Sequence, residues 1–273
     1  MLETIRLRVF RGDASGGEER EYPVRTFPGM VVLDAIHQIQ GEQDGTLACR
    51  WNCKAAKCGS CSAEINGHPA LMCKSRVEQF YDAAGLIRVS PLKTFPLIKD
   101  LVTDVSWNYR KAQQIPPLTV AADAPRPFRM MQGDVDRIQE FRKCIECFLC
   151  QDICHVLRDH GRKDAYFGPR FMIKIASLDM HPMDDLERRP HLMRAAGVGY
   201  CNVNKCCQEV CPEHIHITDN GIIPLKERVA DEFYDPIRGL LRMLGLGRSR
   251  RQPMPEEAFT APPEPAAERK PSP

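Results

Sequence analysis

The chain of 273 residues has no apolar run that approaches the length of about 20 residues needed to cross a bilayer as a helix. Even residues 239–247 form only a short apolar stretch, and Arg242 interrupts it. The first ten residues also lack the apolar core of a secretory signal. We therefore expect reduced cysteines rather than the disulfides of a secreted protein, and membrane attachment only through partner chains.

The sequence also lacks an excess of charge of either sign. It contains 38 lysines and arginines against 36 aspartates and glutamates, so the formal net charge is +2. No large basic field favours a nucleic-acid partner. The length suggests about two domains, each with a modest core.

Cysteine, by contrast, is abundant: the sequence has 13, and most of them fall at the spacings of metal ligands. Between residues 144 and 154, successive cysteines are separated by two, two and three residues. Bacterial ferredoxins use this spacing, in which the first three thiolates bind one cubane cluster and the fourth binds another. The cysteines of this run are Cys144, Cys147, Cys150 and Cys154. Because the fourth thiolate binds another cluster, the run predicts a second ferredoxin half elsewhere in the chain.

The second half lies at Cys201, Cys207 and Cys211, with Pro212 directly after it. A complete four-iron half would carry a cysteine at position 204, but the residue there is Asn204. One iron then lacks its usual ligand, which predicts a [3Fe-4S] cluster at one of the two sites. The predicted ligands of that cluster are Cys154, Cys201 and Cys207, and those of a [4Fe-4S] cluster are Cys144, Cys147, Cys150 and Cys211.

Cys206 is an alternative ligand to Cys207. Four residues would then separate it from Cys211 instead of three, and the ferredoxin geometry would be lost. We therefore favour Cys207 and assign no role to Cys206.

A different spacing occurs nearer the N-terminus. Cys53, Cys58 and Cys61 are separated by four and then two residues, as are the ligands of plant-type [2Fe-2S] ferredoxins. Cys73 fits as the fourth ligand, because the pair Asn66-Gly67 predicts a hairpin that folds Cys73 back beside Cys61.

The residues around this motif also suit a cluster. Gly59 and Ser60 have little side chain to obstruct it, and a tight loop lets backbone N–H groups point at the sulfurs. Cys49 precedes the motif and is left over. We interpret it as a small buried residue, because using it in place of Cys53 would discard the standard spacing.

The hydrophobic pattern predicts an α+β protein that begins with a β-grasp ferredoxin domain. Residues 4–10 alternate apolar and charged side chains as a half-buried strand does, and residues 21–27 return as a second strand after a turn at 13–19. Residues 31–40 have a helical period, and residues 87–91 form the expected last strand.

The rest of the chain is predicted to be mostly helical. Residues 97–109 are partly helical, and residues 115–127 are rich in proline, as linkers are. Asp134 is the expected N-cap of a helix that leads to Cys144, and Gly168-Pro169 begins another. The predicted divisions are a [2Fe-2S] ferredoxin domain (1–110), a linker (111–130), a bacterial-ferredoxin-like [4Fe-4S]/[3Fe-4S] domain (131–235) and a basic, proline-rich extension (236–273).

Together these motifs resemble the iron-sulfur subunit of succinate dehydrogenase and quinol:fumarate reductase, respiratory complex II. The resemblance covers nearly all of residues 1–235, with further matches at 28–36, at 98–102, at Gly168-Pro169 and at Cys211-Pro212. It implies that a separate flavoprotein subunit oxidises succinate at FAD. Three clusters then pass single electrons to a quinone beside membrane anchor subunits, on the cytoplasmic face of the plasma membrane.

The resemblance also implies the order of the clusters. The [2Fe-2S] cluster would lie nearest the flavin, the [4Fe-4S] cluster would follow, and the [3Fe-4S] cluster would lie nearest the quinone. Because the dicarboxylate binds to another chain, no catalytic residue is expected here, and the direction of the reaction stays open.

The quinone side departs from the ubiquinone-reducing members of that family. Those members have a proline directly after the cysteine that ends the first run and a tryptophan five residues beyond that cysteine, where this chain has His155 and Asp159. A histidine often follows the first cysteine of their second half, where this chain has Asn202. We place His155 and Asn202 near the quinone, with His155 either a proton donor or a packed side chain. The start Cys-Ile-Glu-Cys resembles members that use menaquinone.

After Pro236 the chain is basic and amphipathic, which predicts either a helix that rests on a membrane or partner, or a helical extension on the surface. The remainder, rich in proline and glutamate, is expected to be a disordered tail or an arm along another subunit.

Two other functions fit part of the pattern. A related reductase subunit, such as that of a heterodisulfide or thiol-driven fumarate enzyme, usually has a further cysteine-rich domain, and this sequence shows none. A zinc-binding structural module would use cysteine pairs, but it has no reason to contain the crossed ferredoxin spacing.

Overall fold

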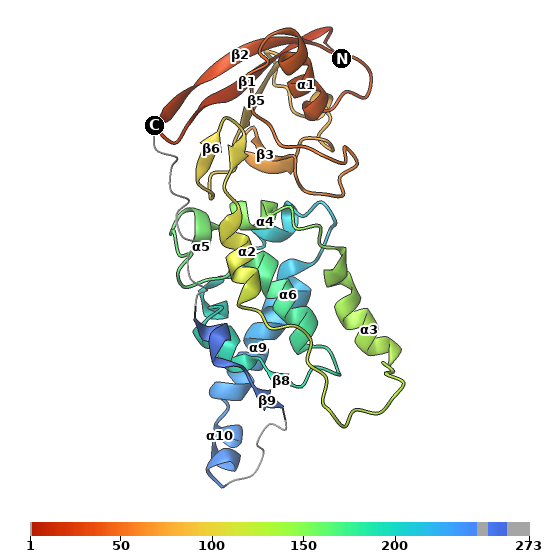
Figure 1. Cartoon of the computed structure of the whole chain (residues 1–273), viewed down its shortest axis with the longest axis vertical. Coiled ribbons are helices and arrows are strands. Elements are labelled where there is room, and N and C mark those ends of the chain that lie inside the picture. Colours follow the sequence, from red (N-terminus) through yellow and green to blue (C-terminus); the bar gives the residue numbers. More distant parts are fainter. Residues whose placement is uncertain (1, 245–250, 261–273) are drawn as a thin grey trace, which may run out of the picture.

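The structure is a computed structural model that describes residues 2–244 and 251–260. Two domains are stacked along the long axis of the molecule. The sheet of the first domain lies at one end, and helix α10 lies at the other (Figure 1). Each domain has its own hydrophobic core.

The first domain is a mixed sheet with one helix packed on it, as the β-grasp prediction requires. β1 (Thr4–Asp13) pairs antiparallel with β2 (Gly16–Arg25) and parallel with β5 (Leu86–Ser90). Alternate side chains of β1 enter the core, where they meet the apolar face of α1 (Val32–Glu42). The other strands are β3 (Ser62–Ile65), β4 (His68–Leu71), β6 (Leu97–Lys99) and β7 (Val102–Thr103), in the order β4-β3-β5-β1-β6-β7.

The first hairpin is tighter than the predicted turn at 13–19. β1 continues to Asp13 and β2 begins at Gly16, so two residues connect the strands. Gly12 pairs with Gly17 near the tip, and a Cβ on Gly12 would stand 2.2 Å from the Gly16 carbonyl oxygen. The strands approach too closely there for any side chain, and glycine lets their pairing continue to the turn.

The prediction of a last strand at 87–91 and a partly helical segment at 97–109 was wrong in part. β6 and β7 follow β5, and only α2 (Ser106–Gln113) is helical. The β6-β7 turn is fixed by Asp100, which has a positive φ of 51° and a buried carboxylate. That carboxylate accepts hydrogen bonds from Arg11 Nε at 3.0 Å and from the Ala48 backbone N–H at 2.8 Å.

The second domain is mostly helical, as predicted. Its longest helices are α6 (Pro169–Asp179), which begins at the expected Gly168-Pro169, and α9 (Ile223–Phe233). The shorter helices are α3 (Gln132–Ile138), α4 (Leu149–Asp152), α5 (His155–Arg158), α7 (Arg189–Arg194), α8 (Cys206–Glu209) and α10 (Pro236–Met243). Short 3₁₀ turns occur in the first domain at η1 (Val77–Gln79) and in the second at η2 (Gln139–Lys143), η3 (Val198–Tyr200) and η5 (Glu256–Phe259), and η4 (Ile217–Ile222) is a π-helical turn.

The helix before the first cysteine run begins earlier and ends sooner than predicted. Met131, not Asp134, is the N-cap, and the Asp134 carboxylate lies in the first turn, where it complements the helix dipole. The helix stops at Ile138, and the 3₁₀ turn η2 then leads the chain to Cys144.

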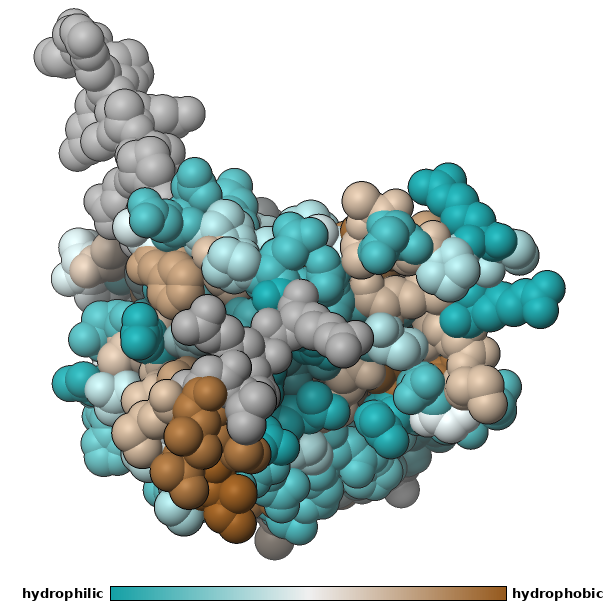
Figure 2. Space-filling view, turned by 90° about the horizontal axis from the view of Figure 1, so that it is seen from below, coloured by the Kyte–Doolittle hydropathy of each residue, from teal (hydrophilic) through white to brown (hydrophobic). Residues whose placement is uncertain are grey.

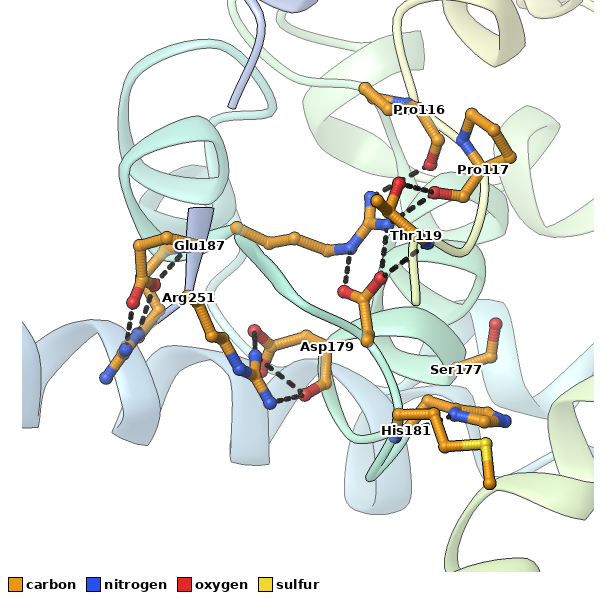
Figure 3. A network of polar contacts seen from close by, with 12 residues as sticks. Pro116, Pro117, Thr119, Ser177, Asp179, His181, Glu187 and Arg251 are labelled. Carbon is orange, nitrogen blue, oxygen red and sulfur yellow. Dashed lines mark hydrogen bonds and ion pairs between the residues drawn. The ribbon is translucent and has the colours of Figure 1, made fainter. Parts of the chain in front are cut away.

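The proline-rich linker is fastened to the second domain by a buried arginine. Arg188 forms an ion pair with Asp184, with Nε 2.6 Å from the carboxylate, and both side chains are fully buried. Its guanidinium also donates to the carbonyl oxygens of Pro116 and Pro117, each at 2.9 Å, and the Thr119 N–H donates to the Asp184 carboxylate at 3.3 Å. Figure 3 shows Pro116, Pro117 and Thr119 close together. The linker therefore follows a fixed path at this point.

The C-terminal extension returns to the second domain. β9 (Gln252–Pro253) pairs in parallel with β8 (Leu186–Glu187), and Arg251 reaches the Asp179 carboxylate at 3.4 Å (Figure 3). Residues 251–260 are thus an arm on their own chain, and the rest of the predicted tail lies outside the described residues. Across 2–244 and 251–260, no helix is both long and apolar enough to span a bilayer.

Candidate iron-sulfur sites

The first site is the loop that carries Cys53, Cys58 and Cys61 between α1 and β3. It contains no regular secondary structure, and its backbone turns through the left-handed region at several residues. The Ala55 and Lys57 N–H groups each donate to Cys53 Sγ at 3.3 Å. The predicted orientation of backbone N–H groups toward sulfur is therefore confirmed at this cysteine.

The predicted hairpin brings Cys73 to the same place. Asn66 and Gly67 have φ of 51° and 82°, as a type I′ turn requires, and they join β3 to β4. The Met72 N–H donates to the Cys61 carbonyl at 3.1 Å, and Cys73 Sγ accepts from the Ala56 N–H at 3.3 Å. The sulfur of Cys73 therefore lies against the loop of the other three cysteines.

The thiols of this loop have shifted pKa values. Burial opposes ionisation of Cys58, but hydrogen bonds from Ser60 and Cys53 outweigh it and lower the pKa of Cys58 to about 7. Burial, together with the charges of Cys73 and Cys58, raises the pKa of Cys61 to about 12. Several thiols are thus crowded together, and a metal cluster would bind them in their deprotonated form.

Cys49 lies apart from this set. Its side chain packs against the first core, and its thiol approaches the Arg50 carbonyl at 3.5 Å. Burial raises the pKa of Cys49 to about 12, as expected for a thiol in a structural role.

The second site is a small pocket of about 20 Å³ in the second domain. The apolar side chains around it include Ile173, Ile215 and Ile217, and Arg170 lies at its edge. Burial is the main cause that raises the pKa of Cys147 to about 12, and neighbouring thiolates add to it. The cysteines that line this space are the four predicted for a [4Fe-4S] cluster, Cys144, Cys147, Cys150 and Cys211.

The third site brings together Cys154, Cys201 and Cys207. Burial raises the pKa of Cys154 to about 11 and that of Cys207 to about 12, and the nearby charges of Cys206 and Cys201 raise both. Tyr166 is fully buried beside them, and burial and then the charges of these three thiols raise its pKa. The structure therefore assembles the three cysteines that the sequence predicted for a [3Fe-4S] cluster.

The two cysteine runs have matching backbones. In the first run, Glu146 and Phe148 have φ of 56° and 61°, and in the second run Val203 and Lys205 have φ of 65° and 64°. The residues lie two and four positions after the first cysteine of their run, and a short helix follows in each case. The runs can therefore be superposed position by position.

This correspondence bears on the two open residues of the second run. Asn204 takes the position of Cys147, and Cys207 takes that of Cys150. Cys206 takes the position of Leu149, which is buried in the first core and is no ligand. The correspondence supports the choice of Cys207 over Cys206.

Asn204 and Cys206 are hydrogen-bonded to each other instead. Cys206 Sγ lies 3.2 Å from Asn204 Oδ1 and 3.6 Å from the Ile153 carbonyl oxygen. Asn204 Nδ2 lies 2.9 Å from His155 Nδ1, and the ring of His160 stands edge-on to His155 at 5.9 Å. His155 is thereby fixed beside the third site, whereas Asn202 is exposed.

The first and second sites touch. A Cβ on Gly59 would stand 2.6 Å from Cys147 Cα, and the φ of Gly59 is +69°. The Ser62 hydroxyl contacts the carbonyl oxygens of Gly59 at 2.8 Å and of Cys147 at 3.0 Å. The second and third sites also adjoin, because the charge of Cys207 acts on Cys150. The three sites therefore follow one another from the first domain into the second.

The contact between the domains includes a buried carboxylate that the sequence analysis missed. Glu64 is fully buried, and it pairs with Arg158 at 2.9 Å and with Lys93 at 3.1 Å. Thr94 binds the neighbouring Asp152 through its N–H and its hydroxyl. An acidic residue within a short apolar strand was the only signal of this contact in the sequence.

The thiol arrangement differs from a single-ion site. In the described parts of the chain, no three or more His, Cys, Asp and Glu side chains converge on one metal position. A zinc ion holds its four ligands within about 2.3 Å. The four thiols of the second site line one pocket, but they do not converge in this way.

Comparison with known proteins finds two matching domain families and a set of relatives. Residues 6–109 match the 2Fe-2S iron-sulfur cluster binding domain, and residues 140–215 match the 4Fe-4S dicluster domain. The "Fumarate reductase iron-sulfur subunit" of Mycobacterium tuberculosis is 32% identical over 68% of this chain and 75% of its own length. The "Succinate dehydrogenase iron-sulfur subunit" of Bacillus subtilis is 29% identical over 79% of this chain and 89% of its own length.

A solved structure agrees with these relatives. A chain of the Mycobacterium smegmatis Sdh1 complex in the apo form has a TM-score of 0.84 and 57% sequence identity to this chain. The match covers 87% of this chain and 100% of that chain.

Proposed function

Because the chain belongs to the family of iron-sulfur subunits of succinate dehydrogenase and fumarate reductase, in which it serves electron transfer, we propose that it holds three clusters in series. When bound, each cluster accepts and releases one electron at a time. The proposed ligands are Cys53, Cys58, Cys61 and Cys73 for [2Fe-2S], Cys144, Cys147, Cys150 and Cys211 for [4Fe-4S], and Cys154, Cys201 and Cys207 for [3Fe-4S].

The pocket at the second site carries this proposal. Its four cysteines come from two separate runs, and they meet in one place between the other two sites. A structural role would not require thiols from both runs to face a common volume. An electron relay does require it, because the middle carrier must lie close to both of its neighbours.

The protein contributes to this relay through its fixed groups. N–H groups aimed at Cys53 and Cys73 stabilise negative charge on those sulfurs and so favour the reduced state of the first cluster. The apolar lining of the second site keeps water away, and its low polarity disfavours added negative charge.

The ends of the series indicate the partners. Cys53 is exposed beside Trp51, so we place the FAD-containing flavoprotein subunit at the first site. We place the quinone, menaquinone by the sequence resemblance, near His155 and Asn202 at the third site, with membrane anchor subunits around it. This arrangement puts the chain on the cytoplasmic face of the plasma membrane as a peripheral subunit.

Iron analysis and EPR of the anaerobically purified chain test the proposal. Clusters with two, four and three irons predict about nine irons per chain. An oxidised [3Fe-4S] cluster has an odd electron count, so it should give a signal without added reductant. A content near two irons would leave only the first site, and zinc without acid-labile sulfide would rule out the relay.

A further inference from the structure

Helix α10 leaves an apolar face uncovered at the end of the molecule opposite the first-domain sheet (Figure 1). Ile237, Leu240 and Leu241 are 68%, 53% and 38% exposed, and Leu244, one turn beyond Leu240, is 65% exposed. The Leu244 N–H donates to the Leu240 carbonyl at 3.1 Å, so the helical geometry extends to this residue. Spacings of three and four residues put all four side chains on one side.

Such a face is unusual on a folded domain. Single exposed leucines are common on protein surfaces, whereas a contiguous apolar group marks a surface that something else covers. Figure 2 views this end of the molecule and shows a compact hydrophobic patch beside hydrophilic surface.

The charge of the same segment indicates what covers it. Residues 236–250 contain four arginines, at positions 238, 242, 248 and 250, and no acidic residue. The formal charge of this segment is therefore +4, although the whole chain has a net charge of only +2. An apolar groove on a protein would match the leucines and isoleucine without matching this charge. A layer of anionic headgroups above acyl chains matches both.

We propose that α10 binds the surface of a membrane that contains anionic lipid. The helix lies in the headgroup layer, with Ile237, Leu240, Leu241 and Leu244 toward the acyl chains and the side chain of Arg238, which is 47% exposed and lies 3.8 Å from Glu232, toward the phosphates. This contact goes beyond the proposed function, which needs only partner chains for membrane attachment. The contact would hold the α10 end of the molecule at the bilayer surface.

Vesicle sedimentation with the full, cluster-loaded chain tests this contact without any partner. The vesicles are phosphatidylcholine, with or without phosphatidylglycerol. The unchanged chain should sediment with the anionic vesicles, less so at high salt, and only weakly with the neutral ones. Arg238→Gln with Arg242→Gln should weaken anionic binding about 25-fold, because each arginine near such a surface is worth about fivefold in partitioning.

A second double variant and a control variant separate the contribution of the apolar face from the effect of placing a charge at any exposed apolar residue. Leu240→Glu with Leu241→Glu should abolish sedimentation. Met131→Glu, at a residue that is 77% exposed before α3, should leave it unchanged. Absorbance of the clusters in the same samples reports folding and tests the proposed function separately.

Three outcomes would overturn the proposal: no sedimentation of the unchanged chain, equal binding to neutral and anionic vesicles, or undiminished binding of the Leu240/Leu241 pair. If the free chain does not sediment with vesicles, but the Leu240→Glu/Leu241→Glu variant loses a membrane subunit from the assembled complex, the apolar face binds a protein partner.

Discussion

The two cysteine runs of the second domain share a backbone but face different neighbours. The first run packs against the first domain, where Gly59 and Ser62 contact Cys147 and where Leu149 enters the core. The second run faces His155 through Asn204. The left-handed turns are nevertheless the same in both. The fold of a run thus does not depend on its second cysteine, and we infer that one side chain sets the number of irons.

The largest effect should come from removing a ligand of the second run. Cys207→Ser should abolish the EPR signal of the third cluster. It should also lower the rate of quinone reduction by more than the loss of an outer-shell partner of a metal does, which costs about 10- to 100-fold. Cys206→Ser is the matched control. It should retain the signal, because Cys206 corresponds to Leu149 in the first run. Equal loss in both variants would break the correspondence of the runs.

Restoring the missing cysteine should make the runs alike. Asn204→Cys supplies a thiolate at the position of Cys147, so the iron content should rise from about nine to about ten per chain. The oxidised EPR signal should fade. An added thiolate also lowers the reduction potential, and each 59 mV lost costs about tenfold in the one-electron equilibrium.

Asn204→Ser separates this effect from loss of the hydrogen bond to His155. That variant should keep the oxidised signal and the iron count. A signal that survives Asn204→Cys, at unchanged iron content, would contradict our reading of this position.

A third test concerns the packing that the first run has and the second lacks. Leu149 is 1% exposed, and Leu149→Ala should lower the free energy of unfolding by about 2 to 5 kcal/mol. Cys206→Ala at the corresponding position should cost only about 1 kcal/mol, since one weak S–H hydrogen bond is lost. Denaturant unfolding of the loaded proteins gives both values. Similar losses would mean that both positions are equally packed.

The smallest expected effect concerns the contact between the first site and the first run. Gly59→Ala adds a methyl group 2.6 Å from Cys147 Cα at a positive φ, and should destabilise the protein by about 1 to 3 kcal/mol. Gly29→Ala is the control, because Gly29 has a φ of +79° and nothing within 4 Å of the added carbon. The difference between their thermal midpoints measures the contact alone. Equal midpoints would show that the domains separate easily.

Local features of the fold were predictable from the sequence. The Asn66-Gly67 hairpin depends on turn chemistry within two residues, and the helix after Gly168 depends on the proline that begins it. The candidate site was predictable for the same reason, because cluster ligands in ferredoxins are recognised by spacing along the chain.

The features that were missed depend on residues far apart in the sequence. The β6-β7 hairpin is fixed by Asp100 and Arg11, which are separated by 89 positions. The linker is fixed by Arg188, about 70 positions beyond the prolines that it binds. Propensity and periodicity describe a chain over a few turns, and they carry no information about such pairs.

The close approach of Gly59 to Cys147 also bears on how the protein is assembled. No methyl group fits between the first loop and the first run, and the second site is lined by residues from 144–150, 170–173 and 211–217, which leave a volume of only about 20 Å³. A scaffold that delivers a preformed cluster needs far more room than that. We therefore expect the first two clusters to enter before the domains close, so that docking of the domains seals a chain that is already loaded. A chain produced without iron should then be cut by protease in residues 114–131 more readily than the loaded chain, since its domains have not yet closed on each other.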